Sequence, residues 1–352
     1  MKIIFRESNE KLFLNKWEEY INNNLASYKY LPIYLEYMLF YTSSLVYDKS
    51  FVIIEQNKCV AICFLPIENN DNTNIISLAN GYTIAPLAIN KRIEKDVFAQ
   101  IDLIAKENDI KKIKFYLDPL IIEYQNKFNY LSEYNYIDSS SSDCLLDLND
   151  ESDILWKNLR KSYKSLINKI EKDNDYEVIY FDKNNLNYGV HEKYRELHAK
   201  AAGRVTRAKE TFDKQFELMK NGFATLIGLK YKGKFIGLNY FFHFQKTVVY
   251  ASGADDPEFT AKKIPIYHVI LWNATKHFKE KCYEYIQYSQ PCGYNKINGF
   301  DDYLDEKQIN ISHFKRGMGT KMVPLFRGIK YLDEELFVSD INRYKISHTF
   351  NS

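Results

Sequence analysis

Two cations between an aromatic residue and two glycines form the part of the sequence best suited to binding a reactive group. Phe314, Lys315 and Arg316 are followed at once by Gly317, and Gly319 comes two residues later. Glycine tolerates positive φ and close approach, so the chain can bend sharply beside two positive side chains. We expect these side chains to contact a carbonyl or phosphate oxygen of a substrate. A solvated basic hairpin turn after a short strand is the alternative interpretation.

A second group of cations follows a predicted helix that ends at Ala202. Gly203 marks the C-terminal end of this helix, and Arg204 and Arg207 come directly after it. Two arginines in a tight loop can converge on one carboxylate or phosphate, because each guanidinium binds such anions with two hydrogen bonds. The alternative is a set of ion pairs between two helices, with acidic partners among Glu196, Glu210 and Asp213.

Carboxylates and strand-end residues complete the candidate site. Asp255 and Asp256 follow a predicted hairpin of residues 223 to 252, and either could accept the proton of an attacking amine. The amine could instead lose its proton to the substrate or to solvent. Tyr288 and Gln290 end a predicted strand, where ligands gather in open α/β sheets. We therefore expect both of them to bind substrate.

Metal and nucleophile signatures are absent from the sequence pattern. No histidine or third carboxylate arrives at a usable spacing from Asp255 and Asp256, so no metal site is expected there. The five cysteines are scattered without CxxC pairs, which argues against structural zinc and a disulfide framework. No Ser-His-Asp, Cys-His or paired-carboxylate pattern can be defended from spacing.

The length of 352 residues favours two domains of ordinary size. Helices, a hairpin and strands are predicted in an α/β order with mixed sheets. We place the boundary near Asn149 and Asp150, which gives domains of residues 1–149 and 150–352. The second domain opens with a basic amphipathic helix predicted from Asp153 to Lys172, read either as a solvated face or as a ridge for a diphosphate or RNA.

A long polar segment runs from Cys292 to Gln308 and carries three aspartates. Loops of this length without secondary structure are uncommon in compact domains and are often functional. The segment is therefore predicted to be a substrate lid, with an ordinary surface loop as the alternative.

The order of elements before Phe314 resembles the FemAB-type branch of the GNAT-fold acyltransferases. The series comprises a hairpin LIGLKYKGKFIGLNYFFHF, a loop YASGADDPEF, an apolar helix IPIYHVILWNATKHFKE, a strand YEYIQYS and the closing FKRGMG. Met318 stands where the family usually has an aromatic residue. The resemblance covers most of residues 151 to 330 and is weak over residues 1 to 150. It implies two tandem GNAT-like domains with mixed sheets.

The resemblance also implies a reaction. Members transfer an activated acyl group to an amine, which needs positioning and stabilisation of the ester oxygen more than a nucleophile on the protein. Phe314 and Lys315 would contact the donor, and we assign Arg204 and Arg207 to an acidic group of the acceptor. The reaction expected is acyl or aminoacyl transfer to an amine of a cell-wall or surface-glycan precursor. The alternatives are an acyl-CoA-dependent N-acyltransferase acting on an amino sugar and a non-catalytic GNAT-fold binding module.

Cofactors and partners follow from the same resemblance. No permanently bound cofactor is expected, and the co-substrate is an aminoacyl-tRNA or an acyl-CoA. The acidic loop with Asp255, Asp256 and Glu258 departs from the CoA-binding pattern, because its carboxylates repel a pyrophosphate. The acceptor is a small-molecule or lipid-linked glycan precursor, and tRNA is a candidate partner.

The sequence predicts a cytoplasmic protein without a strong overall charge. The formal net charge is only +2, so no global basic field points to nucleic acid. Charged residues come too early for a signal peptide, and no run approaches the roughly 20 apolar residues of a membrane span. The oligomeric state cannot be predicted from this pattern.

Overall fold

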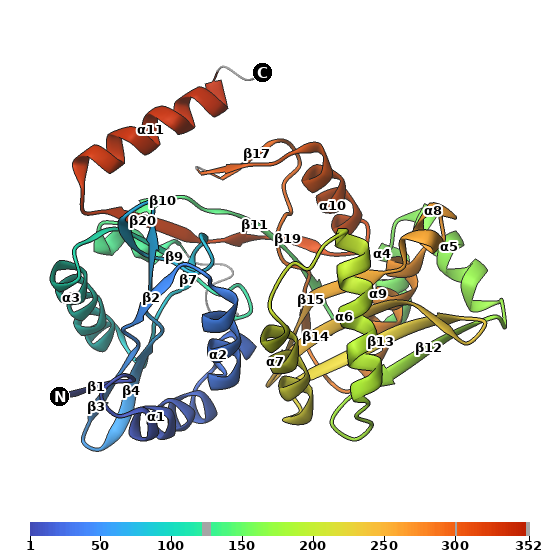
Figure 1. The fold of residues 1–352 in the computed structure, drawn as a ribbon, viewed down its shortest axis with the longest axis horizontal. Coiled ribbons are helices and arrows are strands. Elements are labelled where there is room, and N and C mark those ends of the chain that lie inside the picture. Colours follow the sequence, from blue (N-terminus) through green and yellow to red (C-terminus); the bar gives the residue numbers. More distant parts are fainter. Residues whose placement is uncertain (122–127, 300, 350–352) are drawn as a thin grey trace. The chain divides into compact units, whose positions relative to one another are not determined.

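The computed structural model describes residues 1–121, 128–299 and 301–349, which fall into two compact units (Figure 1). Unit 1 contains Met1–Ser142, Asn295–Asp305 and the described residues from Pro324 on. Unit 2 contains Asp143–Tyr294 and Glu306–Val323. The chain thus passes into unit 2 a few residues before the boundary expected at residues 149 and 150, and two later segments belong to unit 1.

Unit 1 is built around two sheets. The strands of the first, in spatial order, are β1 (Lys2–Phe5), β3 (Phe51–Glu55), β4 (Lys58–Cys63) and β8 (Leu87–Ala88), all antiparallel. The strands of the second are β10 (Ile137–Asp138), β20 (Arg327–Tyr331), β9 (Ile110–Tyr116), β6 (Thr73–Ile76), β5 (Pro66–Asn70) and β2 (Leu45–Asp48), with β7 (Thr83–Ile84) also pairing with β9. This sheet is mixed, because β6 and β7 run parallel to β9.

Unit 1 also contains helices, 3-10 turns and a two-stranded ribbon. The helices are α1 (Glu10–Asn23), α2 (Pro32–Tyr41), α3 (Lys91–Glu107) and α11 (Glu334–Thr349), with 3-10 turns η1 (Tyr28–Tyr30) and η3 (Tyr130–Tyr134) and a ribbon of β17 (Ile297–Gly299) and β18 (Asp302–Tyr303). Helix α3 buries Val97, Ile101 and Ile104 in the core, as the spacing of these residues predicts. Strands β3 and β4 form a hairpin that turns at Gln56 and Asn57, both at positive φ.

Unit 2 has one large mixed sheet with helices on both faces. Its strands, in spatial order, are β12 (Tyr176–Phe181), β13 (Ala224–Tyr231), β14 (Lys234–Phe244), β15 (Thr247–Asp255), β16 (Tyr285–Gln287), β11 (Ser141–Asp147) and β19 (Lys321–Leu325). Its helices are α4 (Ser152–Asn158), α5 (Lys161–Glu171), α6 (Tyr188–Ala202), α7 (Lys209–Lys220), α8 (Pro257–Ala261), α9 (Ile266–Glu280) and α10 (Glu306–Arg316).

The two faces of this sheet can be read from strand β14. A Cβ added to Gly237 would lie 2.2 Å from Ile266 of α9, so this residue and its alternate neighbours face α9. Tyr240 faces the opposite side and hydrogen-bonds to His191 of α6. Helices α6 and α7 therefore cover one face, and α9 covers the other with α5 packed against it (Figure 1).

Three sequence-based predictions of local structure are wrong. The helix predicted from Asp153 to Lys172 is two helices, because Leu159 and Arg160 between them are extended. The residues before Phe314 form helix α10 and not a strand or hairpin turn. The segment from Cys292 to Gln308 is not a structureless loop, since its described residues include β17, β18 and the first turn of α10; Phe300 within it lies outside the described residues.

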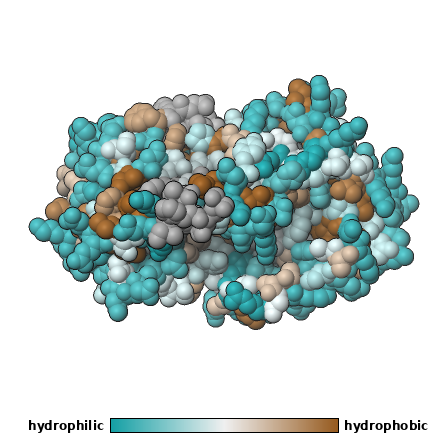
Figure 2. Space-filling model, turned by 90° about the horizontal axis from the view of Figure 1, so that it is seen from above, coloured by the Kyte–Doolittle hydropathy of each residue, from teal (hydrophilic) through white to brown (hydrophobic). Residues whose placement is uncertain are grey.

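The structure, like the sequence, contains in its described residues no helix that is long and apolar enough for a membrane span. On the face shown in Figure 2, hydrophilic residues dominate and apolar residues lie in small separated groups. This distribution is ordinary for a folded domain surface, because single exposed apolar residues are common.

His243 on β14 makes the stability of unit 2 depend on pH. Its ring hydrogen-bonds to Thr225 Oγ1 at 3.1 Å and Tyr283 Oη at 2.8 Å, and burial lowers its pKa to about 3. The unfolded chain binds a proton at this residue below about pH 6.5, whereas the folded chain does not. Stability is therefore lost as the pH falls, with about 2 kcal/mol gone at pH 5 from this residue alone.

Denaturant unfolding measured from pH 8 to pH 4.5 checks this expectation. The His243→Gln variant should lose less stability over that range than the original chain. His313 is exposed at the end of α10, although partial burial and the nearby Arg160 and Arg316 also lower its pKa. His313→Gln serves as the control and should change the pH dependence less than His243→Gln does. An identical pH slope in the original chain and in His243→Gln would contradict a neutral buried His243.

Candidate functional site

The FKRGMG segment closes helix α10 against the junction of α4 and α5. The backbone N–H of Arg160 donates to the carbonyl of Gly317 at 2.9 Å, and the Arg160 guanidinium donates to the carbonyl of His313 at 3.0 Å. A Cβ on Gly317 would lie 2.4 Å from the ring of Tyr163, so only glycine fits here. The break at Arg160 therefore lets the chain bind the C-terminal end of α10, whose carbonyls have no partner within the helix.

Lys315 is buried and fixes the segment that follows β16. It is only 7% exposed, and its Nζ donates to the carbonyls of Ser289 at 3.0 Å and Gln290 at 2.9 Å. Burial lowers the pKa of Lys315. These two bonds use two of the three N–H donors of an ammonium group, so one donor can still point to a ligand.

A buried polar cluster lies beside Lys315. Asp143 accepts hydrogen bonds from Gln287 Nε2 at 2.5 Å and from the backbone N–H of Cys144 at 2.7 Å. Cys292 Sγ donates to the carbonyl of Ser289 at 2.9 Å. The charge of Asp143 favours the protonated form of Lys315 and so opposes the effect of burial on its pKa.

The neighbours of Lys315 also contact the protein. Arg316 Nη1 donates to the carbonyls of Cys292, at 3.2 Å, and Gly293, and its guanidinium lies 4.1 Å from the ring centre of Tyr294. The Phe314 ring packs against Tyr163 and His268 of unit 2. Lys315 and Arg316 thus fix residues 289–293, and Phe314 packs α10 against its neighbours. Contact of these three side chains with a substrate stays a prediction.

Strand β15 extends beyond its parallel neighbour. Pairing between β15 and β16 ends at Val249 and Gln287, whereas β15 continues to Asp255. Tyr288 and Gln290 follow the carboxyl end of β16, where the sequence predicts them. The ring of Tyr288 is buried, and its centre lies 6.3 Å from that of Tyr250. The second half of β15 is therefore bonded to β14 alone.

Three tyrosines gather around this end of β15. Tyr194 Oη lies 2.6 Å from Ser252 Oγ, and Tyr267 Oη donates to Asp255 Oδ1 at 2.7 Å. The pKa of Tyr250 is raised by burial and by the nearby Tyr194 and Asp255. We call this group the tyrosine site; its members are Tyr194, Tyr250, Tyr267, Asn239, Ser252, Gly253 and Asp255.

Gly253 and Asn239 give the site its special geometry. The two residues are partners in the β14–β15 register. A Cβ on Gly253 would lie 2.5 Å from Tyr250 Oη and 2.6 Å from Asn239 Oδ1. Asn239 is fully buried, and among the described residues neither of its amide atoms has a hydrogen-bond partner. Such unpaired buried groups are rare in folded proteins and call for a functional explanation.

The two aspartates after β15 differ in environment. Asp255 accepts hydrogen bonds from Tyr267 and Thr260 within the tyrosine site. Asp256 caps helix α8 through the N–H of Glu258 and pairs with Lys200 and Lys234. Burial alone would raise the pKa of Asp256, but hydrogen bonds from these lysines outweigh it and lower the pKa to about 2. Of the two, Asp255 is the one whose hydrogen bonds lie within the tyrosine site.

Arg204 and Arg207 lie in different environments. Gly203 ends helix α6 at φ +69°, as predicted, and Arg204 is exposed beyond it. Arg207 donates to Gln215 Oε1 at 3.0 Å and Tyr194 Oη at 3.3 Å. Gln215 in turn donates to Ser252 Oγ at 3.4 Å. Arg207 is thereby connected to the tyrosine site, and binding of an anion by both arginines stays a prediction.

Sequence reasoning did not identify most of the tyrosine site. Tyr194, Tyr250, Tyr267 and Asn239 come from four different elements, so no local spacing brings them together. One usable signal was present, because a glycine inside a strand, such as Gly253, often marks a close approach to a ligand or another chain segment.

Comparisons with known proteins show the fold. No protein-family model and no curated protein match the sequence. Among solved structures, FemX matches with a TM-score of 0.61 and 13% identity, covering 88% of this chain and 93% of that chain. The C-terminal domain of a putative lysylphosphatidylglycerol synthetase from Agrobacterium fabrum matches with a TM-score of 0.60 and 10% identity, covering 96% and 99%. L-PGS from Bacillus licheniformis matches with a TM-score of 0.53 and 12% identity, covering 85% and 89%.

The chain therefore shares the α/β fold of these structures, which supports the FemAB-like GNAT fold expected from the sequence. The alignment with FemX extends over most of both chains. The predicted fold class, two tandem GNAT-like domains with mixed sheets, is confirmed. At 13% identity or less, the likeness extends to the fold alone.

Proposed function

We propose that this chain transfers an activated acyl or aminoacyl group to an amine of a cell-wall or surface-glycan precursor at the tyrosine site. One observation carries the proposal: β15 loses its parallel partner after Val249, where an unpaired amide, three phenol groups and a carboxylate converge. Ligand sites of open α/β sheets lie beyond the carboxyl ends of strands. The FemAB-like GNAT fold supports this reaction class by analogy.

Asp255 is the base that we assign to this reaction. The amine nitrogen attacks the ester carbonyl, a C–N bond forms, and the bond from the carbonyl carbon to the leaving oxygen breaks. The proton of the amine passes to Asp255, and Asp255 returns a proton to the leaving oxygen as it departs, which gives an amide and a free hydroxyl group. Hydrogen bonds from Tyr267 and Thr260 hold the carboxylate in a fixed orientation, which general base catalysis requires.

Residues at the end of α10 position the donor. Lys315 fixes residues 289 and 290 beside the unpaired part of β15, and its third N–H is assigned to the donor carbonyl or terminal nucleotide. Phe314 and Arg316 support this arrangement, and Tyr288 and Gln290 line the donor side. Arg204, which is exposed after α6, is assigned to an acidic group of the acceptor.

The surroundings of two helix N-termini help to choose between an aminoacyl-tRNA and an acyl-CoA as the donor. The N-terminus of α8 is occupied by the side chain of Asp256, which leaves no place for a pyrophosphate. This favours an aminoacyl ester of tRNA as the co-substrate. The N-terminus of α9, in contrast, has no side-chain cap and follows Lys262 and Lys263. That feature suits a CoA pyrophosphate, and an acyl-CoA-dependent N-acyltransferase is therefore the second candidate.

Thermal unfolding with candidate donors tests the proposal. A ligand at about 100 times its dissociation constant stabilises the folded chain by roughly 2.7 kcal/mol, which is readily measured. We expect charged tRNA to raise the melting temperature, and the rise to shrink as salt increases. Uncharged tRNA and free CoA are the controls. Stabilisation by acetyl-CoA and CoA without an effect of charged tRNA would contradict the tRNA donor and support the second candidate.

A further inference from the structure

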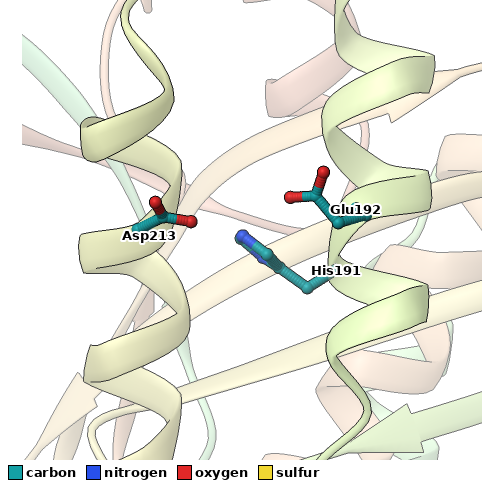
Figure 3. Close-up of side chains that lie close together, drawn as sticks. All are labelled: His191, Glu192 and Asp213. Atoms are coloured by element: carbon teal, nitrogen blue, oxygen red, sulfur yellow. The ribbon is translucent and has the colours of Figure 1, made fainter.

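Three possible metal ligands meet between helices α6 and α7. His191 and Glu192 lie on α6, and Asp213 lies on α7 (Figure 3). One ring nitrogen of the histidine and one oxygen of each carboxylate all lie within 4.8 Å of one another. In Figure 3 the imidazole points into the space between the two carboxylates. A single ion placed there could contact all three side chains after small rotamer changes.

His191 carries an unsatisfied nitrogen. The residue is fully buried, and its Nδ1 lies 2.8 Å from Tyr240 Oη. Its Nε2 has no hydrogen-bond partner among the described residues, although it is buried. A buried polar atom without a partner is costly to the fold. An ion bound at Nε2 would remove that cost, and this observation does not depend on the carboxylates.

The bond to Tyr240 has the form expected behind a metal-binding histidine. Ligating histidines usually donate their second ring N–H to an oxygen, which fixes the tautomer and leaves the other nitrogen as the ligand. Here the Tyr240 hydroxyl can accept from Nδ1, and Nε2 then presents its lone pair to the carboxylates. One imidazole and two carboxylates suit zinc and neighbouring transition metals, whereas magnesium prefers oxygen ligands alone.

Two basic side chains form ion pairs with the carboxylates of Asp213 and Glu192. Lys209 Nζ lies 2.9 Å from Asp213 Oδ2, and Arg195 Nη2 lies 2.7 Å from Glu192 Oε2. Tyr188 Oη also donates to Asp213 at 3.0 Å. These ion pairs are partly exposed and therefore weak. The Lys209 side chain is 48% exposed, so an incoming ion can displace it into solvent.

We infer that His191, Glu192 and Asp213 form a binding site for a divalent cation of the zinc class, which links α6 to α7. The bound ion completes its coordination with water. It fixes the connection from Gly203 to Ala208 that joins the two helices and carries Arg204 and Arg207. The inference goes beyond the proposed acyl transfer and does not depend on it.

Calorimetric titration of the full chain with zinc chloride, after removal of metals by EDTA and of the EDTA itself, tests the inference. We expect one zinc ion per chain. His191→Gln and Asp213→Asn should each weaken binding by about 100-fold. Glu196→Gln removes a carboxylate of the same helix that pairs with Lys193 and lies outside the cluster. It is the matched control and should bind zinc as the original chain does.

A gain-of-binding variant separates ligation from damage to the fold. Lys209→Gln removes the cation that competes for Asp213, so zinc should bind about twofold to fivefold tighter, the strength of an exposed ion pair. Cobalt, added to the original chain, should give visible absorption bands that differ from those of the aqueous ion and that His191→Gln abolishes. Absence of zinc binding, equal affinity in Asp213→Asn, or a cobalt spectrum like that of the free ion would each overturn the inference.

Discussion

We expect replacement of Asp255 by asparagine to lower the rate of the proposed acyl transfer by about 100-fold or more and to leave the fold intact. The amide has the size of the carboxylate, and its single oxygen can still accept the hydrogen bond from Tyr267 while its NH2 group donates to Thr260 Oγ1. It cannot take the proton of the amine. General base catalysis contributes roughly 100-fold to 10,000-fold. The measurement is kcat for transfer of a labelled amino acid from charged tRNA to a cell-wall precursor that carries a free amine.

The control for this substitution lies three residues further on. Glu258→Gln makes the same chemical change on the exposed surface of α8, where the carboxylate pairs with Lys262. Its rate should equal that of the original chain. Tyr267→Phe, which removes one hydrogen bond to Asp255, should fall between the two. An Asp255→Asn enzyme with an unchanged kcat would show that the amine loses its proton elsewhere.

Replacing Lys315 by methionine destabilises the protein by about 3 kcal/mol. The change removes the donor to the carbonyls of Ser289 and Gln290 and removes a positive charge that interacts with the buried Asp143. Hydrogen bonds to charged groups contribute about 1.5 to 3 kcal/mol, and each buried acceptor left unpaired costs about 1 to 3 kcal/mol. Urea unfolding of the two chains measures the difference.

Lys307→Met provides the matched control for Lys315. Lys307 lies on the same helix, is exposed, and should change stability by less than about 0.5 kcal/mol. If Lys315→Met unfolds at the same urea concentration as the original chain but no longer responds to charged tRNA, Lys315 is a substrate contact without a structural function.

Much of unit 2 could be predicted from local sequence. The β13–β14 hairpin turns at Lys232 and Gly233, both at positive φ, and Gly233 is the residue type that such a turn requires. Helix α9 buries an apolar face whose spacing is visible in the sequence. These elements depend on residues close together in the chain, so pattern and turn chemistry suffice.

Helix α10 shows why the surroundings of Lys315 were predicted wrongly. Its buried residues are Ser312 and Lys315, which are polar, so the helix has no apolar stripe to reveal its period. The break between α4 and α5 has no proline or glycine to mark it. It is stabilised instead by the bonds from Arg160 to the end of α10, more than 150 residues away in sequence.

The candidate site was only partly accessible to sequence reasoning for the same reason. Asp255, Tyr288 and Gln290 follow strands, and position at a strand end is a local property. The partners of Lys315 are separated from it by 25 residues or more, and the tyrosine site draws on four elements. Packing of the sheet brings these residues together, and this proximity cannot be predicted from their spacing along the chain.

Hydrogen–deuterium exchange with a bound donor tests the location of the working site most directly. The probe is a tRNA that carries its amino acid through a stable amide, compared with the same tRNA uncharged. The account predicts that the charged form slows exchange in peptides covering residues 250–256 and 288–293, which border the unpaired half of β15. Slowed exchange confined to other segments, or equal exchange with the two tRNAs, would contradict it.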